Sequence, residues 1–122
     1  MANILVVDDD ELVRATLCHL LKDVGHHVRE AANGREALSL VHAQVPEILV
    51  TDIVMPGKEG IETILEIRRS FDTIKIIAIS GGSGNGRITY LGLAELAGAD
   101  RVISKPFSRA DLLQAVDDLM AG

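Results

Sequence analysis

Residues 4–9, Ile-Leu-Val-Val-Asp-Asp, join a short apolar run to two adjacent acids. Three later apolar runs are followed in the same way by a polar residue: 48–50 by Asp52, 76–79 by Ser80, and 102–103 by Lys105. Short apolar runs are typical of strands that are buried on both faces of a parallel sheet. The carboxyl ends of parallel strands meet at one edge, where open α/β sheets bind their ligands. We therefore expect the acids, the hydroxyl and the ammonium group to share one crevice.

Apolar residues at helical spacing separate these strands. A weaker strand is expected over 27–31, which brings the number to five, and each strand is followed by a predicted helix. This alternation predicts an α/β fold with a doubly wound, five-stranded parallel sheet, right-handed crossovers and helices on both faces. The apolar faces of the helices include Leu12 in the first helix and Leu65 in the third. Gly25 is expected to end the first helix, and Ser108 is expected to cap the last one.

Composition limits the classes of function. The chain has 122 residues, of which 48% are hydrophobic and 2% aromatic, and its formal net charge is -6. This length suits a single domain over residues 1–122. The negative charge, the scattered basic residues and the scarcity of aromatic rings argue against direct nucleic-acid binding. No signal-like N-terminal segment and no apolar run of membrane-spanning length is found, so we expect a cytoplasmic protein without membrane contact.

The acids are the most informative polar residues. Taken alone, Asp9 or Asp10 would be an ordinary cap of the following helix, and this alternative stays open for the pair. Asp52 adds a further carboxylate at the same edge, and close carboxylates repel one another by about 1 kcal/mol per pair. A positive charge is therefore needed nearby. Oxygen-rich sites suit Mg²⁺, and Lys105 would supply a second, fixed positive charge.

Four motifs, taken in order along the chain, resemble the receiver domain of bacterial two-component response regulators, the CheY-like domains. They are Val6-Val7-Asp8-Asp9, Asp-Ile-Val-Met-Pro-Gly at 52–57, Ser80-Gly81 and Lys105-Pro106-Phe107. The resemblance spans the whole chain and implies a flavodoxin-like sheet with the strand order 2-1-3-4-5. It also implies a cis bond between Lys105 and Pro106, for which an ordinary trans turn is the alternative.

The resemblance implies a role for each site residue. For the phosphoryl group these are Asp52 as phosphoacceptor, Ser80 and Lys105; for Mg²⁺ they are Asp8, Asp9, Asp52 and the backbone carbonyl of Val54. Ser80 would hydrogen-bond the phosphoryl group, and Lys105 would pair with one of its oxygens. This agrees with the chemistry, because a carboxylate that attacks phosphorus needs positive charge around the equatorial oxygens.

The implied function is a signalling module that takes a phosphoryl group from a histidine kinase or histidine phosphotransfer protein. It would then change a surface that binds an unknown downstream protein. Apart from self-phosphorylation by small donors and autodephosphorylation, no enzymatic activity is expected. A receiver fragment of a larger regulator or hybrid kinase remains an alternative.

An aspartate-nucleophile phosphohydrolase is a more remote alternative. Residues 8–12 come close to the D-x-D-x-T/V opening of haloacid-dehalogenase phosphatases, in which Asp8 would be the nucleophile. That family needs a late acid pair at a strand end, whereas Asp117-Asp118 lies in the last predicted helix.

Three positions are expected to modulate the mechanism. Val102 stands where many receivers have an aromatic residue on the fifth strand, so the coupling must differ. Val54 and Gly82 lie where this family influences the attacking water, and since neither side chain can orient it, we expect a long-lived phosphorylated state. The segment 81–91 is rich in glycine but lacks the Walker residues, and we expect it to reorganise on activation. A helix is expected near 88–96.

Overall fold

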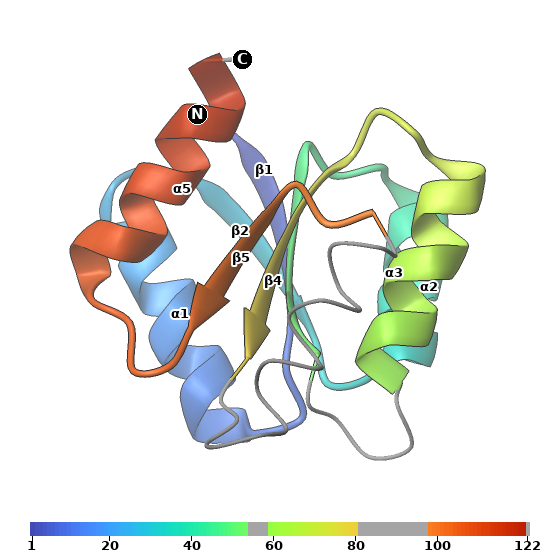
Figure 1. The fold of residues 1–122 in the computed structure, drawn as a ribbon, viewed down its shortest axis with the longest axis horizontal. Coiled ribbons are helices and arrows are strands. Elements are labelled where there is room, and N and C mark those ends of the chain that lie inside the picture. The colour runs from blue at the N-terminus through green and yellow to red at the C-terminus, as the bar shows by residue number, and fades with distance from the viewer. Residues whose placement is uncertain (54–58, 81–97, 122) are drawn as a thin grey trace.

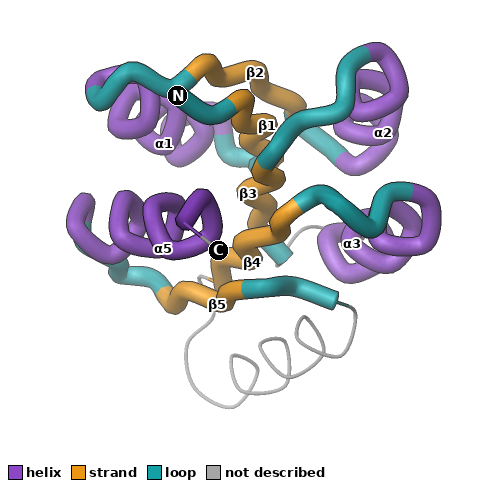
Figure 2. The backbone as a smooth tube through the Cα atoms, turned by 90° about the horizontal axis from the view of Figure 1, so that it is seen from above, coloured by secondary structure: helices purple, strands orange, loops and turns teal. Residues whose placement is uncertain are grey.

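The computed structural model describes residues 1–53, 59–80 and 98–121. Its centre is a five-stranded parallel sheet flanked by helices (Figure 1), and the strand order is β2-β1-β3-β4-β5 (Figure 2). The strands are β1 (Asn3–Val7), β2 (His27–Ala31), β3 (Ile48–Asp52), β4 (Lys75–Ser80) and β5 (Arg101–Ser104). The α/β class, the parallel sheet and the order that the resemblance implied are confirmed.

Four helices in the described residues cover the two faces of the sheet. Helices α1 (Glu11–Asp23) and α5 (Arg109–Ala121) lie on one face, and α2 (Gly34–Ala43) and α3 (Glu59–Ser70) on the other, with the sheet between them (Figure 2). The fold is therefore doubly wound, as predicted. The helix expected near 88–96 lies outside the described residues. None of the described helices is long and apolar enough to cross a membrane.

Alternation along the strands divides the core into two halves. On β1, Leu5 and Val7 pack toward α2 and α3, while Ile4 and Val6 pack toward α1 and α5. All four side chains are fully buried. Since complete burial of a Val, Leu or Ile side chain contributes about 1.5–3 kcal/mol, aliphatic residues can stabilise this core almost without aromatic rings.

Two predicted core positions were wrong. Leu12 is 76% exposed and Leu65 is 45% exposed. The buried side of α1 is formed by Leu17, Cys18 and Leu21, and Leu12 is five residues from the first of these, which places it on another side of the helix. The buried side of α3 likewise runs through Ile64 and Ile67, so its neighbour Leu65 points outward.

The predicted helix ends are confirmed. Gly25 follows α1 with a φ of 97°, in the left-handed region that glycine adopts without a steric penalty. At α5, the Asp111 N–H donates to the Ser108 hydroxyl at 3.0 Å, and the Ser108 N–H donates back to the Asp111 carboxylate at 3.1 Å. This reciprocal capping fixes the start of α5 at Arg109, five residues after the end of β5 at Ser104.

Candidate functional site

Three acids meet at the carboxyl edge of the sheet. Asp8 follows β1 directly and Asp52 ends β3, and these strands are neighbours in the sheet. Asp8, Asp9 and Asp52 each bring one carboxylate oxygen to within 4.8 Å of the others. We call these three residues the acid cluster. The prediction that the acids come together at this edge of the sheet is confirmed.

The capping alternative is settled by the neighbouring residue. The Asp10 carboxylate accepts hydrogen bonds from the N–H groups of Leu12 and Val13 at 2.9 and 3.2 Å, so Asp10 is the N-cap of α1. The carboxylate of Asp9 has no hydrogen bond or ion pair within the described part of the chain, and Asp9 is exposed. Capping therefore uses the third acid of the run and leaves the first two for the cluster.

Asp8 is buried with only half of its carboxylate satisfied. Its Oδ1 accepts the Asp10 N–H at 2.8 Å, whereas its Oδ2 is buried without a hydrogen-bond partner. Asp52 is 7% exposed. Burial of a carboxylate costs free energy, and for Asp8 the missing hydrogen bond adds to this cost, so the ionised forms of both residues require positive charge close by.

Lys105 brings one positive charge to the cluster. Its Nζ lies 3.5 Å from Asp52 Oδ2 and 3.9 Å from Asp8 Oδ2. Its backbone N–H donates to the Ser80 carbonyl at 2.8 Å, which ties the end of β5 to the end of β4. The Lys105–Pro106 peptide bond is cis, as the resemblance implied. Asp52, Ser80 and Lys105 thus lie at the ends of three adjacent strands.

The charge balance of the cluster appears in the pKa of Asp8, which is raised to about 6. Burial is the main cause, and the nearby carboxylates of Asp52 and Asp9 add to it. The Asp10 N–H and the Lys105 ammonium group act in the opposite direction without balancing it. Ionisation of Asp8 is therefore disfavoured even with the Lys105 ammonium group beside it.

The donor set fits a small divalent cation. All candidate ligand atoms are carboxylate oxygens, the buried Asp8 carboxylate has an oxygen without a hydrogen bond, and the exposed Asp9 leaves the cluster open to solvent. Mg²⁺ prefers oxygen ligands and retains several waters, so it suits a site that the protein encloses on one side only. The carbonyl of Val54 and the position of Gly82 lie outside the described residues.

Comparison with known proteins identifies the family. Residues 4–117 match the family model described as the response regulator receiver domain. The chain belongs to the receiver domain family of response regulators.

Two curated relatives illustrate the similarity of this receiver domain to longer proteins. It is 38% identical over 109 residues to the probable transcriptional regulator ycf27 of Guillardia theta, covering 89% of this chain and 41% of that protein. It is 36% identical over 118 residues to the response regulator MprA of Mycolicibacterium vanbaalenii, covering 96% and 49%. The chain therefore spans less than half the length of these two relatives.

Solved structures of similar length share the fold. A putative response regulator from Chloroflexus aurantiacus has a TM-score of 0.90 and 30% identity, over 99% of this chain and 98% of that one. The chemotaxis protein CheY4 of Vibrio cholerae has a TM-score of 0.85 and 27% identity, over 98% of both chains. The flavodoxin-like architecture of the receiver domain is thus seen in proteins of about this size.

Two residues that support the acid cluster were not predicted. Gly60, in the first turn of α3, lies against the end of β3, and a Cβ there would be 2.6 Å from the Asp52 carbonyl oxygen. Glycine is thus required for α3 to approach the backbone of Asp52 so closely. Arg14 donates from Nη1 to the Asp8 carbonyl at 2.8 Å. Arg14 could have been suspected from the sequence, because it lies one helical turn after Asp10. Nothing in the residues around Gly60 indicates its contact with Asp52.

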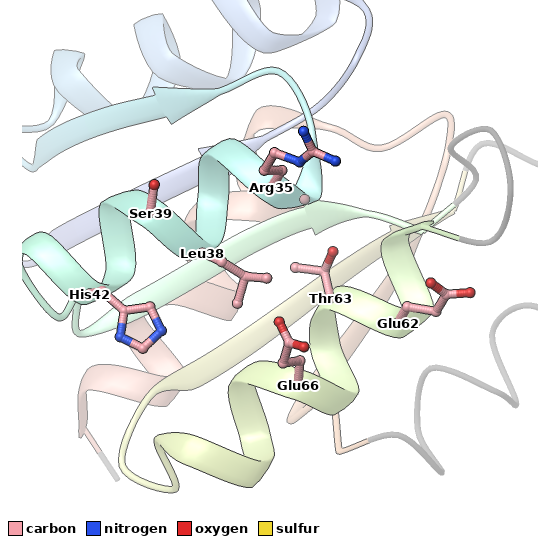
Figure 3. A pocket seen from close by; sticks show the side chains of 8 residues that line it. Arg35, Leu38, Ser39, His42, Glu62, Thr63 and Glu66 are labelled. Atoms are coloured by element: carbon pink, nitrogen blue, oxygen red, sulfur yellow. The ribbon is translucent and has the colours of Figure 1, made fainter.

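An open groove between α2 and α3 is separate from this site (Figure 3). Arg35 and His42 project from α2, and Glu62 and Glu66 from α3. No residue of the acid cluster lines it. This groove and the acid cluster therefore lie in different parts of the described fold. Val102, for which a modulating role is predicted, is partly buried and packs on the α2 and α3 side of the core.

Proposed function

We propose that this receiver domain accepts a phosphoryl group on Asp52, in a reaction that depends on Mg²⁺. The observation that supports this most is the surroundings of Asp52. Its carboxylate is nearly buried at the end of a central strand, with the Lys105 ammonium group at 3.5 Å and two further acids in the same cluster. A nucleophile, a fixed cation and a cation-binding donor set are the parts that phosphoryl transfer by positioning requires.

In the proposed reaction, a carboxylate oxygen of Asp52 forms a bond to phosphorus while the bond from phosphorus to the donor nitrogen breaks. The electron pair of that bond stays on the imidazole of the donor histidine, which takes a proton from solvent. Lys105 would neutralise one phosphoryl oxygen, and the Ser80 hydroxyl would hydrogen-bond another. Asp8, Asp9, Asp52 and the Val54 carbonyl would hold the metal. When bound, Mg²⁺ would supply the positive charge that the phosphoryl oxygens and the carboxylates both need.

The proposed donors are a histidine kinase or a histidine phosphotransfer protein, because the chain belongs to the response regulator family. Phosphorylation would change a surface that binds a downstream protein. Direct nucleic-acid binding by this domain is not proposed, since its net charge is -6. We place its action in the cytoplasm. We also propose that it is a phosphoacceptor, with no enzymatic activity beyond self-phosphorylation and autodephosphorylation.

The phosphohydrolase alternative is disfavoured by the C-terminal acids. Asp117 and Asp118 lie within α5, as predicted, and not at a strand end. The Asp118 carboxylate accepts hydrogen bonds from Gln114 at 2.7 Å and Arg101 at 2.6 Å, and these bonds lower its pKa. Asp118 thus joins α5 to β5 and does not contribute to the acid cluster.

Intact-mass spectrometry after incubation with acetyl phosphate and Mg²⁺ tests the proposal. The parent chain should gain one phosphoryl group and Asp52→Asn should gain none. Asp117→Asn, which removes an exposed carboxylate on α5, is the matched control and should behave like the parent. Equal phosphorylation of Asp52→Asn would overturn the assignment. If Asp52→Asn gained a phosphoryl group and Asp8→Asn gained none, the nucleophile would be Asp8, as in the hydrolase alternative.

A further inference from the structure

Arg14 joins the acid cluster to strand β2. Its Nη1 donates to the Asp8 carbonyl at 2.8 Å, and its Nε donates to Glu30 Oε1 on β2 at 2.9 Å. The Arg14 side chain is only 15% exposed, whereas that of Glu30 is 49% exposed. An arginine that is largely buried and divided between a backbone carbonyl and a carboxylate is held in one orientation.

These contacts fix the backbone of Asp8 from both sides. The Asp8 N–H donates to the Ala31 carbonyl of β2 at 3.2 Å, and the Asp8 carbonyl accepts from Arg14. Glu30 and Ala31 are consecutive on β2. The hydrogen bonds therefore form a closed ring that runs from Asp8 through β2 to Arg14 and back to Asp8. The backbone N–H of Arg14 also donates to the Asp10 carbonyl at 2.9 Å. Arg14 therefore contacts the chain on both sides of Asp9.

The carbonyl that Arg14 holds belongs to the peptide group between Asp8 and Asp9. Together with the φ angle of Asp9, the plane of this peptide sets the direction in which the Asp9 side chain leaves the backbone. The Asp9 carboxylate has no partner of its own within the described residues, so its direction is set through the two peptide groups beside it, of which the second is held by the Asp10 N–H bond to Asp8 Oδ1. The backbone thus orients the Asp9 side chain toward Asp8 and Asp52.

We propose that Arg14 is a positioning residue for cation binding, which orients the Asp8–Asp9 peptide while Glu30 anchors its guanidinium group. This inference rests on the proposed Mg²⁺-dependent function. Arg14, although positively charged, would thus favour Mg²⁺ binding, because it orients the backbone that carries two of the acids.

Charge and position predict opposite effects when Arg14 is removed. If Arg14 acted only through its charge, its loss would strengthen Mg²⁺ binding, because one repelling cation would be gone. If Arg14 orients the peptide, its loss weakens Mg²⁺ binding. Residues that orient metal ligands without touching the metal typically affect metal affinity tenfold or more, so we expect the Kd to rise by about tenfold.

Titration calorimetry with MgCl₂ on the metal-free protein distinguishes these effects. Arg14→Met keeps much of the apolar stem and removes the donors, and it should bind Mg²⁺ about tenfold more weakly. Arg14→Lys keeps the charge but loses the two-directional guanidinium, and it should also bind more weakly. Glu30→Gln keeps an oxygen that can accept the Nε–H and should stay within about twofold of the parent. Arg69→Met, which removes an exposed arginine from α3, is the matched control.

Affinities should be measured well below the melting temperature of each variant, with circular dichroism to confirm folding. A parent-like or tighter Kd in folded Arg14→Met overturns the inference, as does a parent-like Kd in Arg14→Lys. Weaker binding in both, with an unchanged Kd in Arg69→Met, supports it. If the parent chain neither binds Mg²⁺ nor gains a phosphoryl group, the proposed function fails first and the inference fails with it.

Discussion

Charged side chains at the two edges of the sheet differ in how fully they are compensated by partners. At the carboxyl edge, the acid cluster collects like charges around one lysine and leaves Asp8 Oδ2 buried without a hydrogen bond. At the amino edge, Arg68 on α3 donates to the carbonyls of Asp72, Ile74 and Gly98, at 3.2, 2.7 and 2.8 Å, and to the Asp100 carboxylate at 2.8 Å. Asp100 in turn accepts the Ile76 N–H at 2.7 Å.

The amino edge holds a network that stabilises the fold, whereas the carboxyl edge holds the candidate functional site. The Arg68 contacts join α3, the loop before β4 and the residues before β5, and each charged group has partners of suitable geometry. Such satisfied networks favour one structure. The acid cluster instead raises the free energy of the folded protein as long as no cation offsets its negative charge. A protein can retain such a site when the opposite edge is well satisfied.

The largest stability effect should follow from breaking the amino-edge network. Arg68→Ala should destabilise the protein by about 2–4 kcal/mol, because it leaves partly buried carbonyls and a carboxylate without their donors. Urea unfolding measures this loss. Arg69→Ala removes the next, exposed arginine and should change stability by at most about 0.5 kcal/mol. Similar losses in both variants would mean that the network contributes little.

The opposite sign is expected at the carboxyl edge. Asp8→Asn removes a buried negative charge and keeps a side-chain oxygen for the Asp10 N–H, so the metal-free protein should gain about 1–3 kcal/mol at pH 7.5. Urea unfolding in the presence of a chelator measures this gain. Added Mg²⁺ should stabilise the parent and not Asp8→Asn. A marked loss of stability in the variant would show that Lys105 already compensates the Asp8 charge.

The advantage of Asp8→Asn should depend on pH. The pKa of Asp8 is about 6 in the folded protein and near the ordinary 3.8 when unfolded, so the folded state binds the proton more tightly. Protonated Asp8 therefore stabilises the fold fully below about pH 3.8, and this contribution is lost as the pH rises through about 6. The stability difference between variant and parent should grow over that range. A constant difference from pH 4 to 7.5 would contradict the raised pKa.

The smallest effect on stability is expected from Asp9→Ala. Asp9 is exposed, so removing its charge relieves less repulsion than Asp8→Asn does, and the metal-free protein should be as stable as the parent or slightly more so. Mg²⁺ binding should still weaken, because one of the three carboxylates is gone. Thermal melts with and without Mg²⁺ test both statements. A large loss of metal-free stability would assign a structural role to Asp9.

Sequence patterns predicted the fold well because strand and helix periodicity is local. The strand at 27–31 and the ends of α1 and α5 agree with the structure, since Gly25 and Ser108 act through their own backbone and immediate neighbours. Leu12 and Leu65 were placed wrongly because an apolar residue does not by itself reveal which side of a helix faces the sheet. The roles of Asp52, Ser80 and Lys105, and the modulating roles of Val54, Gly82 and Val102, remain predictions.

The sequence alone determined the alternation of strands and helices and the position of a polar residue at or just after the ends of four of the five strands, because both depend on short-range order. It also carried the motifs of the receiver family. Only the tertiary structure decided that Asp10, and not Asp9, caps α1, and that Asp8 is buried with one oxygen that lacks a hydrogen bond. It alone revealed the contacts of Arg14 with β2 and of Gly60 with Asp52. Burial, pKa and hydrogen-bond geometry depend on residues that are distant in the chain, and their partners are known only once the strands have been assembled.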